Sequence, residues 1–452
     1  MKILHYGLGF PPYRTGGLTK YCIDLIKTQK EMGHDVAMMW PGKFTFSGHF
    51  VHIKKSISNN GITSFEVVNP LPVSLDEGIK DIKAYTEKCP NPQAYKELLK
   101  QYAPDVVHVH TLMGLHREVL EGAKQMGIKI VFTSHDYFGI CPKVTLFRNG
   151  HVCDGVCEAC EQCNESALSI KKIKMLQSGM YRALKDTMIV KKIRAAHRQE
   201  FFEESIAVEA EHNSSEEKQQ KNGFEQYEKL RNYYMSFFKM VDIIHFNSSV
   251  SESVYRKYLS KDVKGQVISI SHREISDNRK IKKFDNHLLK ITYLAPPKPF
   301  KGYIILRDAL DELWSEGNKT IRLTMYNQAD DNREYMQVKG SFDYKQLESI
   351  FDDTDVLIMP SICKETFGFT VLEALSFGVP VIVSENVGAK DLLGKTGEYG
   401  MVIKPTKEGV KQAVKRLIDE KELLEDYNWN IVNRMDFNKI LNSYQEIQKL
   451  YE

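Results

Sequence analysis

The sequence predicts an α/β protein of two doubly wound domains that face each other across a cleft. Short apolar runs alternate with helical patterns along most of the chain, which is typical of parallel sheets covered by helices. At 452 residues the chain is also too long for one hydrophobic core. A polar run at residues 274–287 separates two series of strands, so we expect domains at residues 1–275 and 288–430, followed by a last helix within 431–452.

The composition is that of a globular protein. Apolar residues make up 42% of the chain and charged residues 27%. A formal net charge of +3 is too small to indicate a nucleic-acid partner. The sequence contains no run of about 18 apolar residues, so it predicts no membrane span. The chain starts like a strand rather than an export signal, so we expect a cytoplasmic protein.

The first domain is predicted from short apolar runs. Residues 2–9 are expected to form a strand that ends in glycine, and helical spacing follows from Leu18. Gly16 and Gly17 therefore start a helix, whose unpaired N–H groups suit an anion, although an ordinary flexible turn would have the same sequence. Further strands are expected at residues 35–40, 105–110, 129–133, 241–246 and 266–270, with a helix at 114–126.

The second domain contains the most informative stretch, residues 355–383, which combines a strand, a loop, a helix and a strand. Glu365 lies in the loop, where ligands bind in open α/β sheets, and Gly368 permits a tight turn before the helix. Glu373 has two interpretations. The spacing from Thr370 to Glu373 matches a capping box, in which the carboxylate accepts a hydrogen bond from the N-cap N–H. A glutamate at the start of a helix also suits a ligand contact.

This stretch resembles the nucleotide-binding signature of the family 4 retaining glycosyltransferases, which have two Rossmann-like domains. The resemblance rests on the two glutamates, which are separated by seven residues as in that family, and on four short motifs. These motifs are Pro360-Ser361, Glu365-Thr366-Phe367-Gly368-Phe369, Leu372-Glu373-Ala374 and Gly378-Val379-Pro380-Val381. The resemblance implies that Glu365 contacts the donor sugar or phosphate, that Glu373 binds the ribose hydroxyls, and that Phe367, Gly368 and Phe369 line the donor site.

The same resemblance extends to positions outside this stretch. It implies that Gly16 and Gly17 face the donor phosphates and the acceptor, and that His135 faces the acceptor side of the cleft, with Asp136 as a candidate to orient its ring. The backbone from Gly340 to Phe342 is expected to face the base of the donor nucleotide. The last helix is expected to cross back to the first domain.

A departure from the family pattern lies in the loop after residue 295. Lys301 matches the lysine that binds the diphosphate, but Pro296 stands where the family carries arginine. Lys298 could replace that arginine as a point charge, although an ammonium cannot fork onto two oxygens. Residues 353–355 have the spacing of a metal-binding Asp-x-Asp motif, but they begin a buried strand in another fold context, so we expect no catalytic metal.

Five of the eight cysteines lie between Cys141 and Cys163. Thiolates at such spacing can close a structural zinc site, and Cys157, Cys160 and Cys163 also have a spacing seen in iron–sulfur ligation. Zinc is preferred because nothing else in the sequence indicates redox chemistry. Family members with a cysteine cluster in the first domain resemble this chain and favour Cys141, Cys153, Cys160 and Cys163 as ligands, with Cys157 as a spare.

Residues 167–238 are expected to form a helical insertion without proline. Its first part is strongly basic and amphipathic, which is typical of a helix bound peripherally to an anionic membrane, here the inner face. A helical hairpin packed on its own domain is the alternative.

These expectations together predict a retaining glycosyltransferase of hexosyltransferase type. By resemblance it would move a sugar from a nucleoside diphosphate sugar to a glycan or lipid-linked acceptor in surface polysaccharide synthesis. A catalytically weak partner subunit, motivated by Pro296, and a nucleotide-sugar epimerase on the same fold are the alternatives.

Overall fold

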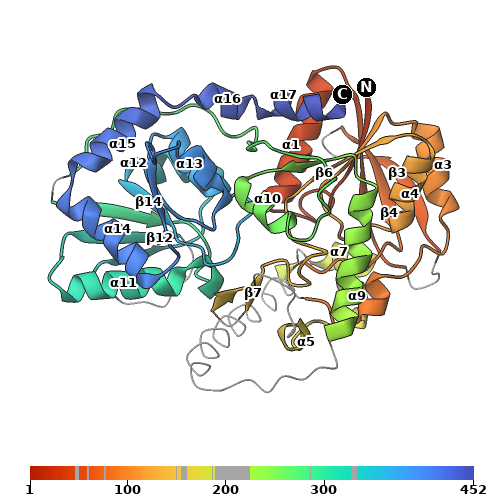
Figure 1. The fold of residues 1–452 in the computed structure, drawn as a ribbon, viewed down its shortest axis with the longest axis horizontal. Helices are drawn as coiled ribbons and strands as arrows, with labels where there is room; N and C mark the ends of the chain where they lie inside the picture. The colour runs from red at the N-terminus through yellow and green to blue at the C-terminus, as the bar shows by residue number, and fades with distance from the viewer. Residues whose placement is uncertain are drawn as a thin grey trace.

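The computed structural model describes residues 1–45, 50–58, 61–75, 78–148, 150–153, 160–185, 187–188, 224–285, 287–326 and 333–452. It contains two parallel-sheet domains side by side, as Figure 1 shows, which confirms the predicted fold class. No helix in these ranges is both long enough and apolar enough to cross a bilayer.

The first domain is built on a sheet of eight strands in the order β10-β9-β6-β5-β1-β2-β4-β3, all parallel except the pair β3–β4. The strands are β1 (Lys2–Tyr6), β2 (Asp35–Pro41), β3 (His52–Ile57), β4 (Thr63–Val68), β5 (Val106–Val109), β6 (Lys129–Thr133), β9 (Ile243–Phe246) and β10 (Gly265–Val267). The sequence did not predict β3 or β4. The strand order reverses between β1 and β5, so the loops after these strands border the crevice where such sheets bind ligands.

The second domain is built on six parallel strands in the order β13-β12-β11-β14-β15-β16. They are β11 (Leu289–Tyr293), β12 (Ile321–Tyr326), β13 (Met336–Lys339), β14 (Val356–Met359), β15 (Val381–Ser384) and β16 (Gly400–Ile403). Here the order reverses between β11 and β14. The loops that carry Lys301 and Glu365 follow these two strands, so the topology brings them together.

Helices cover both faces of each sheet. In the first domain they are α1 (Gly17–Glu31), α2 (Ile82–Tyr85), α3 (Gln93–Tyr102), α4 (Arg117–Gln125), α9 (Phe224–Met235), η2 (Ser236–Lys239) and α10 (Ser249–Tyr255). In the second they are η3 (Pro299–Lys301), α11 (Tyr303–Ser315), η4 (Tyr344–Gln346), α12 (Leu347–Asp352), α13 (Phe369–Ser376), η5 (Gly388–Leu392), α14 (Lys407–Asp419) and α15 (Glu422–Asn433).

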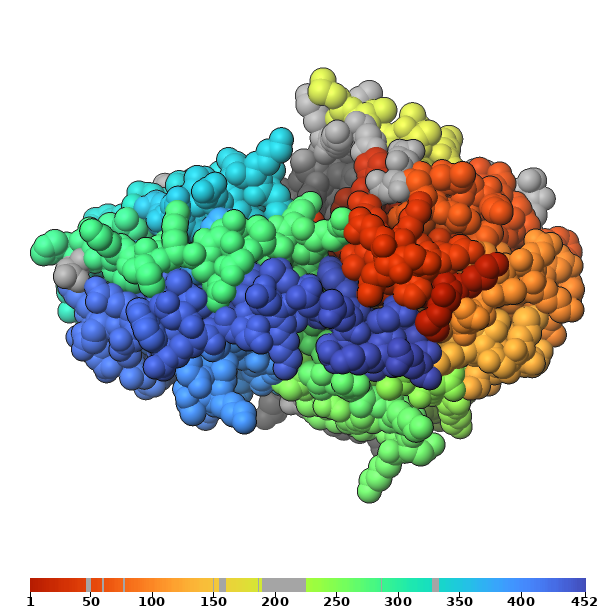
Figure 2. Space-filling view, turned by 90° about the horizontal axis from the view of Figure 1, so that it is seen from above, coloured from red at the N-terminus to blue at the C-terminus, as the bar shows by residue number. Residues whose placement is uncertain are grey.

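The last part of the chain returns to the first domain, as the blue band in Figure 2 shows. It is divided into α16 (Phe437–Leu441), α17 (Ser443–Gln448) and η6 (Lys449–Tyr451) rather than one helix. Tyr444 and Tyr451 bury their hydroxyls against the first domain, donating to Ser271 O at 2.9 Å and contacting His108 Nδ1 at 2.6 Å. The chain ends beside its own N-terminus (Figure 1).

The insertion contains a small hairpin, β7 (Phe147–Arg148) and β8 (His151–Val152), and the helices α5 (Cys160–Cys163), α6 (Ile170–Leu176) and α7 (Gly179–Leu184). The expected continuous basic helix is broken between α6 and α7. Gln177 there accepts a hydrogen bond from Val73 N at 2.9 Å, and Ser178 caps α7. Arg182 turns inward and pairs with Glu66 at 2.9 Å, so α7 packs on its own domain.

Candidate active site

Lys301 and Glu365 form an ion pair at the switch point of the second sheet. Lys301 follows β11 and ends η3, whereas Glu365 lies in the loop between β14 and α13. Gly302 allows the two loops to approach, because it has φ +79° and a Cβ there would lie 2.1 Å from Pro360 O. Backbone hydrogen bonds from Glu365 N to Asn386 O (2.9 Å) and from Gly388 N to Glu365 O (3.1 Å) hold the loop in place.

The Glu365 carboxylate is kept anionic. Burial raises its pKa, but the Lys301 ammonium and hydrogen bonds from Lys301, Cys363 and Ser361 outweigh this, so the pKa lies below its ordinary value. Ser361 Oγ donates to Glu365 Oε1 at 3.1 Å. Conversely, burial lowers the pKa of Lys301 while the charge of Glu365 raises it, and the net shift is upward. The carboxylate can therefore accept hydrogen bonds at neutral pH but cannot act as a proton donor.

The first domain meets this loop directly. Thr366 Oγ1 donates to His135 O at 3.0 Å, and Ser248 Oγ donates to Thr366 O at 2.6 Å. Gly17 lies opposite Phe369, since a Cβ at Gly17 would be 3.3 Å from that ring. The structure therefore brings Gly17, His135, Glu365 and Phe369 to one place between the domains.

The His135 ring is oriented by His110 and not by Asp136, so the expectation for Asp136 is wrong. His135 Nε2 lies 3.3 Å from His110 Nδ1. The Asp136 carboxylate instead accepts hydrogen bonds from Thr111 Oγ1 (2.9 Å) and Phe138 N (2.8 Å), and burial raises its pKa to about 6. Burial lowers the pKa of His135 to about 3, so the imidazole is neutral.

Glu373 does not form the capping box. The N-cap of α13 is Gly368, with φ +108° and no side-chain cap. The carboxylate instead accepts a hydrogen bond from Tyr344 OH and lies 3.5 Å from His272 Nε2. The capping interpretation is therefore wrong, and the buried Glu373 borders a pocket together with Tyr344 and Asn278.

The other expected donor-side residues lie around this centre. Phe367 is buried and its ring contacts that of Phe369, with centroids 5.3 Å apart. Lys298 places its ammonium 5.3 Å from the Phe300 ring centroid, while Pro296 is exposed. Gly16 is the N-cap of α1, and Gly340 is exposed directly after β13.

Two family models match the chain. One, described as Glycosyltransferase Family 4, matches residues 15–151, and one described as Glycosyl transferases group 1 matches residues 276–433. The chain belongs to the family 4 glycosyltransferases.

The chain is also similar to a curated protein and to several solved structures. A Klebsiella pneumoniae protein described as an uncharacterized 42.6 kDa protein in the cps region is 26% identical over 163 residues, which is 33% of this chain and 40% of that protein. Sucrose-phosphate synthase from Thermosynechococcus elongatus has a TM-score of 0.55 at 14% identity, covering 100% of this chain and 99% of that one. Anabaena HepE, in complex with UDP and glucose, has a TM-score of 0.57 at 12% identity with the same coverage. Identities this low show the shared fold alone.

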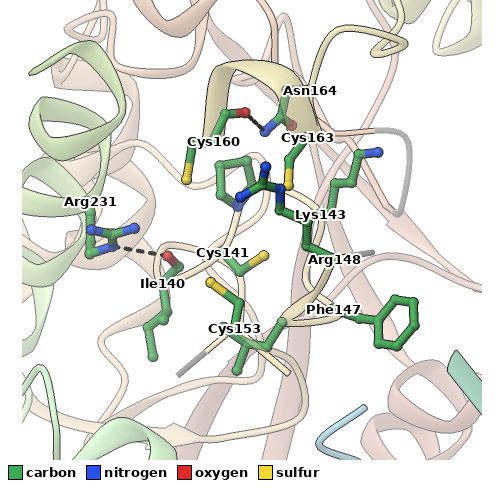
Figure 3. A pocket seen from close by; sticks show the side chains of 12 residues that line it. Ile140, Cys141, Lys143, Phe147, Arg148, Cys153, Cys160, Cys163, Asn164 and Arg231 are labelled. Atoms are coloured by element: carbon green, nitrogen blue, oxygen red, sulfur yellow. Dashed lines mark hydrogen bonds between the residues drawn. The ribbon is translucent and has the colours of Figure 1, made fainter. Parts of the chain in front are cut away.

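In this family 4 glycosyltransferase, four cysteines of the insertion line one pocket (Figure 3). Cys141 follows the His135 loop, Cys153 follows the hairpin, and Cys160 and Cys163 begin and end α5. Backbone hydrogen bonds fix this framework, with Cys153 N donating to Leu146 O at 2.7 Å. Cys157 lies outside the described residues.

A second group of potential metal ligands lies outside the insertion. Among the described residues, His5, Cys22 and His110 place their donor atoms within 4.8 Å of one another. The aspartates of the Asp-x-Asp spacing lie at the opposite end of β14 from the site. There Asp353 pairs with Arg322 at 2.6 Å and Asp355 accepts from Lys290 N at 2.9 Å.

Sequence reasoning missed two cleft residues of this glycosyltransferase. Asn247 follows β9, is 1% exposed, and neither its amide nitrogen nor its amide oxygen has a partner among the described residues. The buried Tyr137 hydroxyl likewise has no partner in those ranges. A buried polar atom without a partner costs about 1 to 3 kcal/mol, so such atoms are candidates to bind a ligand. For Asn247, its position directly after β9 was the available signal in the sequence.

Proposed function

We propose that the protein transfers a sugar from a nucleoside diphosphate sugar to a glycan or lipid-linked acceptor, with retention of anomeric configuration. The observation that carries this proposal is the partly buried Lys301–Glu365 pair, held against the His135 loop between the two domains. The Lys301 ammonium has N–H donors besides the one bonded to Glu365, and these can bind a diphosphate. The carboxylate of Glu365 is anionic at neutral pH and can accept hydrogen bonds from sugar hydroxyls.

Glu365 and His135 suit a reaction in which no side chain donates a proton to the leaving diphosphate. Glu365 is anionic and the imidazole of His135 is neutral, so neither supplies a proton at neutral pH. The departing diphosphate would then accept the proton of the acceptor hydroxyl on the same face, while Lys301 and the N-terminal end of α13 stabilise the developing negative charge. Asn247 and Tyr137 are proposed to contact the acceptor.

The test is a panel of nucleoside diphosphate sugars, beginning with uridine diphosphate sugars because the HepE structure contains UDP. We expect donor hydrolysis or transfer, with the α configuration of an α donor kept in the product when followed by NMR. Glu365→Gln should lower turnover more than donor affinity, because a contact near the reacting sugar matters most in the transition state. Glu385→Gln, a change of an exposed glutamate after β15, is the control.

Three failures have different meanings. A donor that binds without any turnover would favour the partner-subunit alternative. Interconversion of the donor sugar without transfer would favour an epimerase. An inverted product would refute retention.

The cysteine pocket is proposed to hold one structural zinc through Cys141, Cys153, Cys160 and Cys163. Four cysteine thiolates are a ligand set of structural zinc sites, with Zn–S bonds of about 2.3 Å. Metal analysis of protein purified without added metal should give one zinc per chain, lost in Cys160→Ser and kept in Cys89→Ser. A folded, metal-free protein with fully titratable thiols would contradict the proposal.

Peripheral membrane contact is proposed through α6 and α7. Met175, Met180 and Leu184 are 51%, 62% and 47% exposed beside the exposed lysines Lys171 and Lys172. Anionic liposomes should therefore carry the protein upward in a flotation gradient, and high salt should release it because it screens exposed charge. Equal flotation with neutral lipid would refute the electrostatic part.

A further inference from the structure

Five histidines lie on one face of the first sheet and connect to one another through hydrogen bonds. His5, His108, His110 and His245 are fully buried and come from β1, the end of β5 and β9, while His135 follows β6 at the cleft. Strand register places them together, because His5 pairs with His108 and His245 pairs with Thr133. The C-terminal segment and α1 cover this face through Tyr451 and Gln29.

The direction of these hydrogen bonds is fixed at one end by a backbone carbonyl. Ile268 O can only accept, so His245 Nε2, at 2.8 Å, must donate. A neutral His245 then accepts at Nδ1, 3.0 Å from Thr133 Oγ1. Since Thr133 donates its one hydroxyl proton there, it accepts from His108 Nε2 at 2.7 Å.

The same rule continues through the C-terminus. His108 Nδ1 must accept from Tyr451 OH at 2.6 Å, and Tyr451 OH accepts from Gln29 Nε2 at 2.8 Å. Gln29 Oε1 then accepts from His5 Nε2 at 2.8 Å. Each imidazole so far donates at Nε2 and accepts at Nδ1, and no donor faces another donor.

The same order of donors and acceptors extends to His135 at the cleft. His5 Nδ1 accepts from His110 Nε2 at 3.0 Å, and His110 Nδ1 accepts from His135 Nε2 at 3.3 Å. Burial favours the neutral rings that this order requires, since it lowers the pKa of His5 and of His245 to about 4. A proton added to His110 would go on Nδ1 and would point this N–H at the N–H of His135.

We infer that this hydrogen-bonded chain holds His135 as the Nε2–H tautomer and leaves Nδ1 as the acceptor of its ring, with His110 and Tyr451 as positioning residues. The catalytic consequence rests on the proposed function: Nδ1 accepts a hydrogen bond from a sugar hydroxyl, which the other tautomer could not do. Tyr451 is linked to His135 through Gln29, His5 and His110, so its effect on the His135 tautomer passes along four hydrogen bonds.

A metal between His5, Cys22 and His110 is the competing explanation of the close approach. It would require unprotonated nitrogens on both rings where they face each other. At 3.0 Å the two nitrogens instead share a proton, and burial raises the pKa of the Cys22 thiol, which disfavours the thiolate.

The test is the tautomer of His135 at neutral pH, read from ring ¹⁵N chemical shifts of protein without substrate and assigned by the signal lost in His135→Gln. We expect the Nε2–H form in the wild type. His110→Phe should populate both tautomers, whereas His110→Gln should keep the original one because its carbonyl accepts and its amide donates. Tyr451→Phe should also populate both, since Gln29 can then rotate and reverse the order.

Tyr444→Phe is the matched control, because it removes another buried hydroxyl of the C-terminal segment, whose partner among the described residues is Ser271 O rather than the chain of histidines. Turnover should fall up to about 100-fold in His110→Phe and recover in His110→Gln, with donor affinity little changed. An Nδ1–H tautomer in the wild type, an unchanged tautomer in Tyr451→Phe, or a stoichiometric metal lost in His110→Phe would overturn the inference. The tautomer and metal measurements can be made before the donor or the acceptor is identified.

Discussion

Lowering the pH from 7.5 to 5.0 should destabilise the first domain by several kcal/mol, because its core histidines are held neutral. His5, His116 and His245 are buried, and burial lowers the pKa of each from 6.5 to about 4. Below pH 6.5 the unfolded chain therefore binds more protons than the folded one, so stability falls as the pH falls. Each ring contributes about 2 kcal/mol at pH 5.0, and about 6 kcal/mol together is comparable to the whole stability of a domain.

His116→Gln isolates one of these contributions outside the cleft. His116 lies in the core beside Tyr95, whose hydroxyl is 2.9 Å from Nδ1. Urea unfolding followed by circular dichroism at both pH values should show a pH-dependent loss about 2 kcal/mol smaller in this variant. His52→Gln, a change of an exposed residue on β3, should leave that loss as in the wild type. A wild-type stability that is the same at pH 7.5 and 5.0 would refute the reasoning.

Three further predictions concern the cleft. Glu373→Gln should weaken donor binding about 10- to 100-fold at unchanged stability, because a hydrogen bond to a charged group is worth about 1.5 to 3 kcal/mol; unchanged affinity by calorimetry would remove Glu373 from the donor site. Asn247→Leu should leave the melting temperature unchanged or raise it, since a buried amide without a partner is lost, while turnover on the acceptor falls; a clear loss of stability would mean that the amide has a structural partner. Gly302→Ala should unfold more easily and lose donor affinity, because the new Cβ would lie 2.1 Å from Pro360 O; a variant with normal stability and affinity would show that the two loops need not approach so closely.

The sequence predicted the second domain well because its signal is local. Residues 355–383 carry the strand, loop, helix and strand in consecutive order, and the structure places β14, α13 and β15 there. By contrast β4 has polar residues among its apolar ones and β3 is mostly exposed, so neither forms the apolar run that marks a buried strand.

The partners within the site could not be predicted in the same way, because they depend on strand register and on tertiary contacts. His135 and Asp136 are adjacent in sequence, yet His110 from the neighbouring strand contacts the ring. The capping box at Thr370 fits the sequence rule, but Gly368 is the N-cap residue, and the carboxylate of Glu373 accepts a hydrogen bond from Tyr344 OH. Gln177 interrupts the basic helix through a contact to Val73, about 100 positions away, and Ser178 caps the helix that follows.

Donor binding by the Lys301–Glu365 centre tests the central claim most directly. Calorimetric titration with a panel of nucleoside diphosphates should identify one that binds, and Lys301→Ala should weaken it about 10- to 100-fold. Lys390→Ala, which removes an ammonium that donates to Glu385 O just after β15, should leave the affinity unchanged. If no nucleoside diphosphate or its sugar binds, or if Lys301→Ala binds as the wild type does, this cleft is not the donor site.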